Sequence, residues 1–359
     1  MSRRRFLKTT ASAAVAAVAA GIGGFFTLQG PPPPPLGAPQ AAPLREPIRV
    51  HMVLYGHHDE GAWDPQLYGT LTQAAMESRH DFRVTISEDV KSEAAETMLE
   101  LAARANDVVV ASTIVYDEAL RNVAPRFPNV YFILEQDPIG ENPKTIINPT
   151  EYPSNVIVLG PGKMTNNYVI GALTAKLAGP DAKLGFIQSL DIPVTVHTGA
   201  TFRLGARSVY PEIEVLRDIM GGFVNPVKNR DSIAFMAANG VKAVLIEQDD
   251  TSGILEAIEQ GIYAIPAFRD LTHFAPDTVI CSSVWNWKPG FSAILDAIAE
   301  GRWGQLRAEN WYWEMTLANG GIGLGTFGNM VNEELRAHAR RLIEDINAGA
   351  VEVPYVDVW

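Results

Sequence analysis

Val50 to Leu71, with the sequence VHMVLYGHHDEGAWDPQLYGTL, is the stretch that decides the fold of this chain. Its first six residues are mostly apolar and predict a buried strand, which Gly56 ends. Pro65 suits the first turn of a helix, where its missing N–H costs nothing. Apolar residues follow at helical spacing, so the stretch predicts a strand, a sharp polar turn and the start of an amphipathic helix.

The predicted turn carries Asp59, Trp63 and Asp64. In an open α/β sheet, ligands bind outside the carboxyl ends of the strands, where such turns lie. Two hydrogen-bond acceptors and one large flat ring suit a small planar polar ligand. An ordinary solvated loop with a half-buried tryptophan explains the same residues, so the turn alone does not decide between the two interpretations.

The composition of the whole chain limits its class. Its 359 residues correspond to about two domains, and 47% hydrophobic residues are enough for each domain to bury a core. The net charge of −12 does not support a nucleic-acid partner, because proteins of that class carry a basic footprint. Cys281 is the one cysteine, which excludes an internal disulfide framework and a metal site built from several cysteines.

Residues 1–29 have the pattern of a twin-arginine export signal. Ser2 to Lys8, SRRRFLK, places consecutive arginines before an apolar pair, and residues 11–26 are a weakly hydrophobic run rich in alanine and glycine. A short amphipathic or membrane-bound N-terminus is the alternative interpretation. No cysteine follows the run, which excludes a lipoprotein anchor, and the signal is either cleaved or kept. We therefore expect an exported protein, in the periplasm or at the outer face of the plasma membrane.

Residues 30–47 are expected to form a linker after the signal. Five consecutive prolines, Pro31 to Pro35, favour an extended polyproline II spacer that holds the folded part away from the membrane. A docking site for a proline-binding partner is the alternative use of such a run.

From Ile48 onward, predicted strands and helices alternate with regularity, which is typical of an α/β fold with parallel sheets. The pattern predicts two doubly wound, Rossmann-like lobes with a ligand cleft between them, the type I periplasmic-binding-protein fold. We expect lobe 1 over residues 48–160 and lobe 2 over residues 161–308. Residues 309–359 are expected to cross back, with an amphipathic helix over residues 332–349 that returns to lobe 1.

Motifs for catalysis are missing from the sequence. It has no G-x-x-x-x-G-K-[ST] phosphate loop and no G-x-S-x-G nucleophile elbow. The HHDE run at residues 57–60 suggests a metal site, but adjacent histidines on a turn rarely converge on one ion, and no H-E-x-x-H helix accompanies them. We therefore expect no enzyme activity, no metal and no cofactor. A metal-dependent hydrolase that uses the His57–His58 turn is the alternative.

Further acidic residues follow two other predicted strands. Residues 247–250, with the sequence EQDD, come at the end of one strand, and Asp137 follows another. These positions correspond to the strand end that carries Asp59. One residue of the first group is expected to cap the helix that follows, which does not exclude ligand contact by another.

The segment VWNWKPG, residues 284–290, places two tryptophans around an asparagine. In a strand, Trp285 and Trp287 would point to the same face, opposite to Asn286. Two indoles on one face are able to stack a flat ligand ring. Packing in the core or at a hinge is the alternative, because tryptophan is usually much buried.

These residues together make the chain resemble the basic membrane protein family of solute-binding proteins, which includes purine-nucleoside receptors of ABC importers. The resemblance spans Ile48 to about Val353. The segment GHHDEGAWDPQLYG resembles the family's opening motif, D-x-S-F-N followed by a helix. This match places Asp59 at the acidic position, Trp63 at the aromatic position and Asp64 at the asparagine.

Later segments extend the resemblance in the order that the family has them. YFILEQD resembles the segment that ends in a ligand-contacting acid, here Asp137. The segment IPVTVHTGATFRLGARSVYP resembles the family's P-x-V…G-F-x-x-G helix and places its stacking aromatic at Phe202. AVLIEQDDTSGILEA resembles the strand–glycine turn and places Gly253 there. VWNWKPG resembles a subgroup with W-N-W at the last cleft strand.

The sequence departs from the family pattern at the position that usually holds ribose. The family's G-V-D-S-D turn, whose first Asp usually binds ribose hydroxyls, is PAFRD here. Phe268 therefore stands at that Asp, and Asp270 follows two residues later. The family's lysine after the late strand is absent from its place, where Trp285 or its neighbours lie. A nucleobase or another flat heterocycle fits this pattern as well as a nucleoside does.

The resemblance implies a non-enzymatic, exported solute-binding protein of an ABC importer that captures a purine-like ligand by cleft closure. Its partners would be this ligand and the permease subunits, and it would meet the membrane through the transporter or an uncleaved signal. A binding protein that reports ligand to a membrane receptor is the alternative. The expected ligand-binding residues are Asp59, Trp63, Asp64, Asp137, Phe202, Gly253, Phe268, Asp270, Trp285, Asn286 and Trp287.

Overall fold

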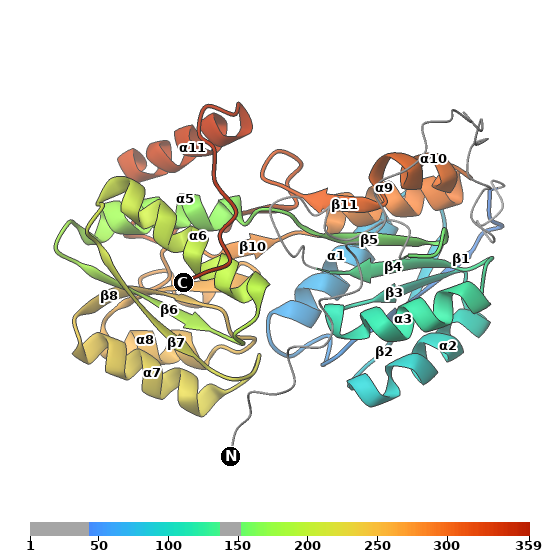
Figure 1. Ribbon diagram of the computed structural model, residues 1–359, viewed down its shortest axis with the longest axis horizontal. Coiled ribbons are helices and arrows are strands. Elements are labelled where there is room, and N and C mark those ends of the chain that lie inside the picture. The colour runs from blue at the N-terminus through green and yellow to red at the C-terminus, as the bar shows by residue number, and fades with distance from the viewer. Residues whose placement is uncertain (1–42, 137–151) are drawn as a thin grey trace, which may run out of the picture. The chain divides into compact units, whose positions relative to one another are not determined.

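The computed structural model describes residues 43–136 and 152–359, which fold into two six-stranded sheets with helices on both faces (Figure 1). The two sheets share the same strand order, in which the first strand of each sheet lies between its second and third strands. The predicted class is therefore confirmed, because the chain has two similar, doubly wound α/β halves. Asp137, the export signal and most of the proline-rich linker lie outside the described residues.

The sheet of the first half is parallel throughout. Its strands are β1 (Ile48–Val53), β2 (Phe82–Ser87), β3 (Val108–Ala111), β4 (Tyr131–Glu135), β5 (Val156–Pro161) and β11 (Tyr312–Met315). Their order is β11-β5-β4-β3-β1-β2. The inner strands are apolar runs buried on both faces, as is typical of parallel sheets.

Five helices cover the first sheet in the described part of the chain: α1 (Trp63–Glu77), α2 (Ala95–Ala105), α3 (Asp117–Val123), α9 (Lys288–Ala299) and α10 (Trp303–Asn310). Together with α9 and α10, α1 packs on the sheet face that carries Val50 and Met52. α2 and α3 pack on the face that carries Val53. The two faces alternate along β1 because successive side chains of a strand point to opposite sides.

The second half has the same plan, with one reversed edge strand. Its strands are β6 (Lys183–Gln188), β7 (Glu214–Ile219), β8 (Val241–Ile246), β9 (Tyr263–Phe268), β10 (Ser283–Trp285) and β12 (Ile322–Leu324). Their order is β12-β10-β9-β8-β6-β7, and β12 is antiparallel to its neighbour.

The second sheet also has helices on both faces. One core contains residues of α5 (Thr165–Ala178), α6 (Pro193–Val209) and α11 (Glu333–Asn347). The other contains residues of α7 (Pro226–Ala238) and α8 (Ser252–Gln260). In the described ranges, no helix has both the length and the apolar character that a membrane span requires.

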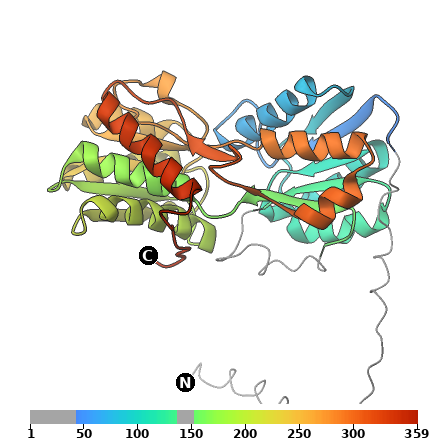
Figure 2. The same ribbon diagram turned by 90° about the horizontal axis from the view of Figure 1, so that it is seen from above.

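The chain passes between the two sheets three times, and this differs from the expected lobe boundaries. It passes to the second sheet after β5, returns after β10, and passes over again between β11 and β12. Residues 288–315 therefore belong to the first half, where α9 packs against α1 through Phe291 and Ile294. The last helix, α11, does not return to the first half. It packs on α5 through Leu335 and Ala339 (Figure 2).

Candidate ligand-binding cleft

A cavity of about 90 Å³ lies at the carboxyl ends of strands from both sheets. A site for one water needs about 10–15 Å³, so the cavity has room for a small organic molecule. Strand ends of this kind are where ligands bind in open α/β sheets. Both halves contribute to the lining, which consists of Tyr55, Trp63, Asp64, Thr113, Ile114, Val115, Glu135, Ser189, Ile192, Val194, Thr195, Phe223, Glu247, Asp249, Phe268 and Trp285.

Four of the predicted aromatic residues form one cluster at the cavity. The ring centroid of Trp63 lies 5.1 Å from that of Phe268, 5.2 Å from Trp285 and 5.0 Å from Trp287. These are edge-to-face contacts, the geometry that aromatic pairs prefer. The Nε1–H of Trp63 donates to the Ser112 carbonyl at 3.1 Å, which fixes the orientation of the indole. Three of the four rings line the cavity, whereas Trp287 is fully buried and does not.

The strand that was expected to carry both tryptophans of the W-N-W motif ends between them. β10 stops at Trp285, and Trp287 is the residue before α9. Asn286 donates its side-chain N–H to the Gly320 carbonyl at 3.0 Å and its backbone N–H to Gly321 at 2.7 Å. Asn286 therefore joins two of the three chain crossings and is not part of the cavity lining.

Phe268, at the end of β9, has a backbone φ of +74°. This left-handed region is one that a bulky side chain rarely adopts. Such a conformation costs on the order of 1–3 kcal/mol, and it is concentrated at functional sites. The side chain is buried and lines the cavity, so the strained residue supplies part of the aromatic wall.

Asp64 lies in the first turn of α1 and is only 4% exposed. Its Oδ2 accepts the Gly56 N–H at 2.7 Å, and its Oδ1 has no hydrogen-bond partner among the described residues. Burial raises the pKa of Asp64 to about 7; Asp249 adds to the rise, and the Gly56 N–H, Lys91 and His57 oppose it. An acid that titrates near neutral pH can accept a hydrogen bond from a ligand or donate one to it.

Asp249 follows β8 in the second half and reaches the start of α1 in the first half. Its carboxylate accepts the N–H of Trp63 at 2.7 Å and also the N–H of Ala62. The helix has no capping side chain of its own, because its N-cap residue is Ala62. Gly61 permits the close approach, since its φ is +79° and a Cβ there would lie 2.6 Å from Asp249 Oδ1. Asp249 therefore caps α1 from the opposite half.

Two predicted site residues lie in the core of the second half and do not line the cavity. Phe202 is fully buried in α6, on the face that α5 covers. A Cβ at Gly171 of α5 would lie 2.0 Å from the Phe202 carbonyl oxygen, so the close contact between the two helices buries this face. Gly253, at the start of α8, lies against Asn229 and Ile233 of α7, where a Cβ would approach within 3.0 Å and 2.9 Å. The stacking ring that the resemblance placed at Phe202 is therefore absent from the cavity.

Asp270 also lies outside the lining and has partners within the second half. Its Oδ2 accepts the backbone N–H of Thr326 at 2.8 Å and the hydroxyl of the same residue at 2.6 Å. Its Oδ1 accepts the N–H of Thr272 at 3.0 Å. These bonds join the end of β9 to the segment after β12.

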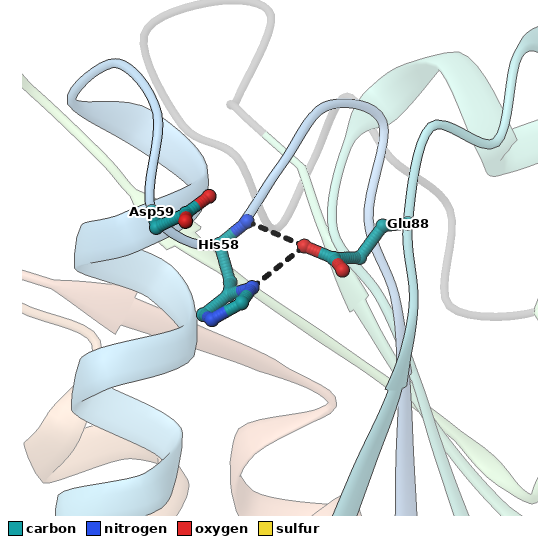
Figure 3. Close-up of side chains that lie close together, drawn as sticks. All are labelled: His58, Asp59 and Glu88. Atoms are coloured by element: carbon teal, nitrogen blue, oxygen red, sulfur yellow. Dashed lines mark hydrogen bonds and ion pairs between the residues drawn. The ribbon is translucent and has the colours of Figure 1, made fainter.

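Asp59 lies on the exposed turn before α1, in a cluster with His58 and Glu88 (Figure 3). The ring Nδ1 and the backbone N–H of His58 both bond to Glu88 Oε1, at 2.7 Å and 2.8 Å. The hydrogen bond from its ring to Glu88 raises the pKa of His58. One ligand atom from each residue lies within 4.8 Å of the others, so the cluster could hold a metal ion. The cluster is open to solvent and contributes nothing to the cavity lining.

The lining includes two glutamates that were not among the expected ligand-binding residues. Glu135 is the last residue of β4, two positions before Asp137, and Glu247 directly follows β8. Both obey the strand-end rule, which is the signal that could have identified them. That rule indicated residues 247–250 as a group. It does not distinguish Glu247 and Asp249, which line the cavity, from the two residues that do not.

Comparisons with known proteins agree with this geometry. The family described as "ABC transporter substrate-binding protein PnrA-like" matches residues 48–357. A purine-binding protein of Brucella abortus (strain 2308) is 27% identical over 311 residues, which are 86% of this chain and 82% of that protein.

Among solved structures, an ABC transporter solute-binding protein from Conexibacter woesei DSM 14684 has a TM-score of 0.70 at 20% identity, over 86% of this chain and 99% of that one. A protein of the same description from Aeropyrum pernix K1 has a TM-score of 0.69 at 18% identity, over 86% and 94%. At these identities the similarity shows the fold alone, which is the type I periplasmic-binding-protein fold.

Proposed function

Since the chain belongs to the family of PnrA-like ABC transporter substrate-binding proteins, we propose that it captures a purine base or nucleoside for an ABC importer. It is a solute-binding protein, and binding proteins of ABC transporters work outside the cytoplasm. The family is a binding-protein family and not typically an enzymatic one, so the proposal includes no catalytic step. The purine-binding relative supports the choice of ligand, and the arginine run near the N-terminus supports twin-arginine export.

The observation that carries the proposal is a cavity lined by flat aromatic rings and acidic side chains from both halves. Trp63 and Asp64 come from the first half, and Phe268 and Trp285 come from the second. A ring that contacts both groups is bound best when the two halves are together. Binding therefore shifts the equilibrium toward the closed form, which the permease subunits would recognise.

The same lining suggests how the protein treats ribose. Phe268 stands where the resemblance places the ribose-binding acid, and it offers no acceptor. Asp270 and Asn286, the candidates to replace that acid, bond to other parts of the second half and of the crossings. A site strongly rejects a ligand that lacks a hydroxyl only if it is built to hydrogen-bond that hydroxyl. We therefore expect the free base to bind within about tenfold of its nucleoside, about 1.4 kcal/mol.

Two measurements test the proposal. Mass spectrometry of material released from the purified, denatured protein identifies a ligand that has remained bound. Titration calorimetry with adenine, adenosine, guanine and guanosine then gives the affinities. Failure of all four to bind would contradict the purine assignment. A strong preference for nucleosides that persists in Asp270→Ala and Asn286→Ala would contradict the account of the ribose position.

A further inference from the structure

The acidic character of the cavity lining says more about the ligand than its shape does. Asp64, Glu135, Glu247 and Asp249 all line the cavity. No lysine, arginine or histidine is among the lining residues of the described chain. A ligand that brings negative charge or acceptor atoms to these four side chains would be repelled, whereas positive charge or N–H donors would be attracted.

Three side-chain donors of the lining form hydrogen bonds within the protein. The Ser189 hydroxyl donates a hydrogen bond to the Glu247 carboxylate at 3.3 Å, and the Thr195 hydroxyl donates one to the Ile192 carbonyl at 3.0 Å. The Trp63 indole N–H donates to the carbonyl of residue 112. These three groups are therefore already used, and a ligand carbonyl oxygen placed next to them would displace an existing bond.

Asp64 adds a further acceptor to the lining. Its Oδ1 is buried and has no hydrogen-bond partner among the described residues, and Asp64 is one of the residues that line the cavity. A buried polar atom without a partner costs free energy, which a ligand N–H would recover. The rings of Trp63 and Trp285 next to it favour a cation, because the face of an aromatic ring is negative.

We propose that the cavity selects a flat heterocycle that is positively charged or presents N–H donors at its edge, and rejects one with a carbonyl oxygen at that edge. The inference rests on the proposed purine function and narrows it to amino-substituted or cationic rings. Asp64 and Glu247 are the specificity-determining residues, one from each half of the cavity.

Two ligand pairs of matched size test this specificity by titration calorimetry at neutral pH. The cation 1-methyladenosine and the neutral N6-methyladenosine carry one methyl group each, on different nitrogens, and differ in charge. Adenosine has an exocyclic amine at the position where inosine has a carbonyl oxygen. The protein should bind 1-methyladenosine at least tenfold more tightly than N6-methyladenosine, and adenosine at least tenfold more tightly than inosine.

Substitutions that replace a carboxyl group by an amide of nearly the same shape show which residues cause the preference. Asp64→Asn and Glu247→Gln should each reduce the ratio between 1-methyladenosine and N6-methyladenosine at least fivefold. Asp181→Asn makes the same chemical change at an exposed position outside the lining and should leave the ratio unchanged. Using two cavity variants protects the test against a failure of either one to fold.

Each result separates this inference from the proposed function. Equal or tighter binding of the neutral isomer and of inosine would overturn the inference and leave purine binding intact. An unchanged ratio in both cavity variants would overturn the assignment to Asp64 and Glu247. Failure of all four nucleosides and of the corresponding free bases to bind would overturn the proposed function, and the inference with it.

Discussion

Trp63 lines the cavity and also packs against three aromatic rings, so its removal has two consequences. Trp63→Ala should weaken ligand binding by about 1–3 kcal/mol, the range for base–aromatic stacking. It should also lower the melting temperature, because the ring contacts and the bond to the Ser112 carbonyl are lost. Titration calorimetry and thermal unfolding measure the two effects separately. Trp63→Phe keeps a ring and should lose less affinity; an unchanged affinity in Trp63→Ala would show that the indole only packs.

Asp64 makes the stability of the ligand-free protein depend on pH. Its pKa is about 7 in the folded protein and about 3.9 in an unfolded chain, so the folded state binds this proton more tightly. The contribution of Asp64 to the free energy of unfolding should fall between about pH 4 and pH 7 and stay level above that range. Asp64→Asn removes this loss and should be more stable than the unmodified protein at about pH 8, by up to ~4 kcal/mol.

Urea unfolding of both proteins at about pH 5 and about pH 8 measures this pH dependence. The advantage of Asp64→Asn should be clearly larger at the higher pH, where the unmodified protein buries an ionised carboxylate. An equal difference in stability at both pH values would contradict the explanation.

Among the elements, α1 is notable because its first turn is completed by a residue from the other half. Asp249→Ala should cost about 0.5–2 kcal/mol of stability, the range for the loss of an N-cap side chain. The amides of Ala62 and Trp63 should also exchange faster with solvent, since both donate to this carboxylate. Asp249→Asn keeps an acceptor and should lose less. Hydrogen exchange detected by mass spectrometry measures the exchange rate of the peptide that contains Ala62 and Trp63. An unchanged rate in Asp249→Ala would argue against the cap.

Most elements of the fold could be predicted from the sequence, because strands and helices have different hydrophobic periods. The half to which α9 belongs could not be predicted. Its buried residues Phe291, Ile294 and Ile298 form an apolar stripe that would suit either core, and the choice depends on the direction in which the chain leaves β10. The same holds for α11. Its apolar residues Leu335 and Ala339 predict that one face of the helix is buried, but they do not show which half of the chain covers that face.

The site was predictable where it follows strand ends and unpredictable where it depends on helix packing. Trp63 and Asp64 begin the helix that follows β1, Trp285 ends β10, and all three line the cavity. Phe202 lies in the middle of α6, and the sequence alone does not show that α5 covers that face. Glu88 joins the turn of His58 only because β1 and β2 are adjacent, which is a contact across 30 residues of sequence.

In the whole molecule, hydrogen bonds join the two halves directly. Besides the cap on α1, Gln66 donates to the Trp285 carbonyl at 2.8 Å, and Arg269 donates to the Gly61 carbonyl at 3.4 Å. Contacts that already favour the closed form lower the differential affinity that a ligand needs in order to populate it.

Export concerns the whole molecule as well, because a twin-arginine signal is read as an address by its receptor. Replacement of Arg3, Arg4 and Arg5 by lysine should leave the precursor in the cytoplasm. All three are changed because the run contains two overlapping pairs. Cell fractionation followed by immunoblotting measures the result, with Arg45→Lys, outside the signal, as the control. Normal export of the triple variant would refute the assignment.

The three crossings of the chain also determine when the protein can fold during its synthesis. The first sheet receives its edge strand β11 at residues 312–315, and the second receives β12 at residues 322–324, in a chain of 359. Until those residues leave the ribosome, β5 and β10 have free edges with unpaired N–H and C=O groups that invite aggregation. Domains generally fold one after another as the chain emerges. Here neither sheet receives its last strand before residue 312, so a nascent chain needs protection of its strand edges until β11 and β12 have emerged.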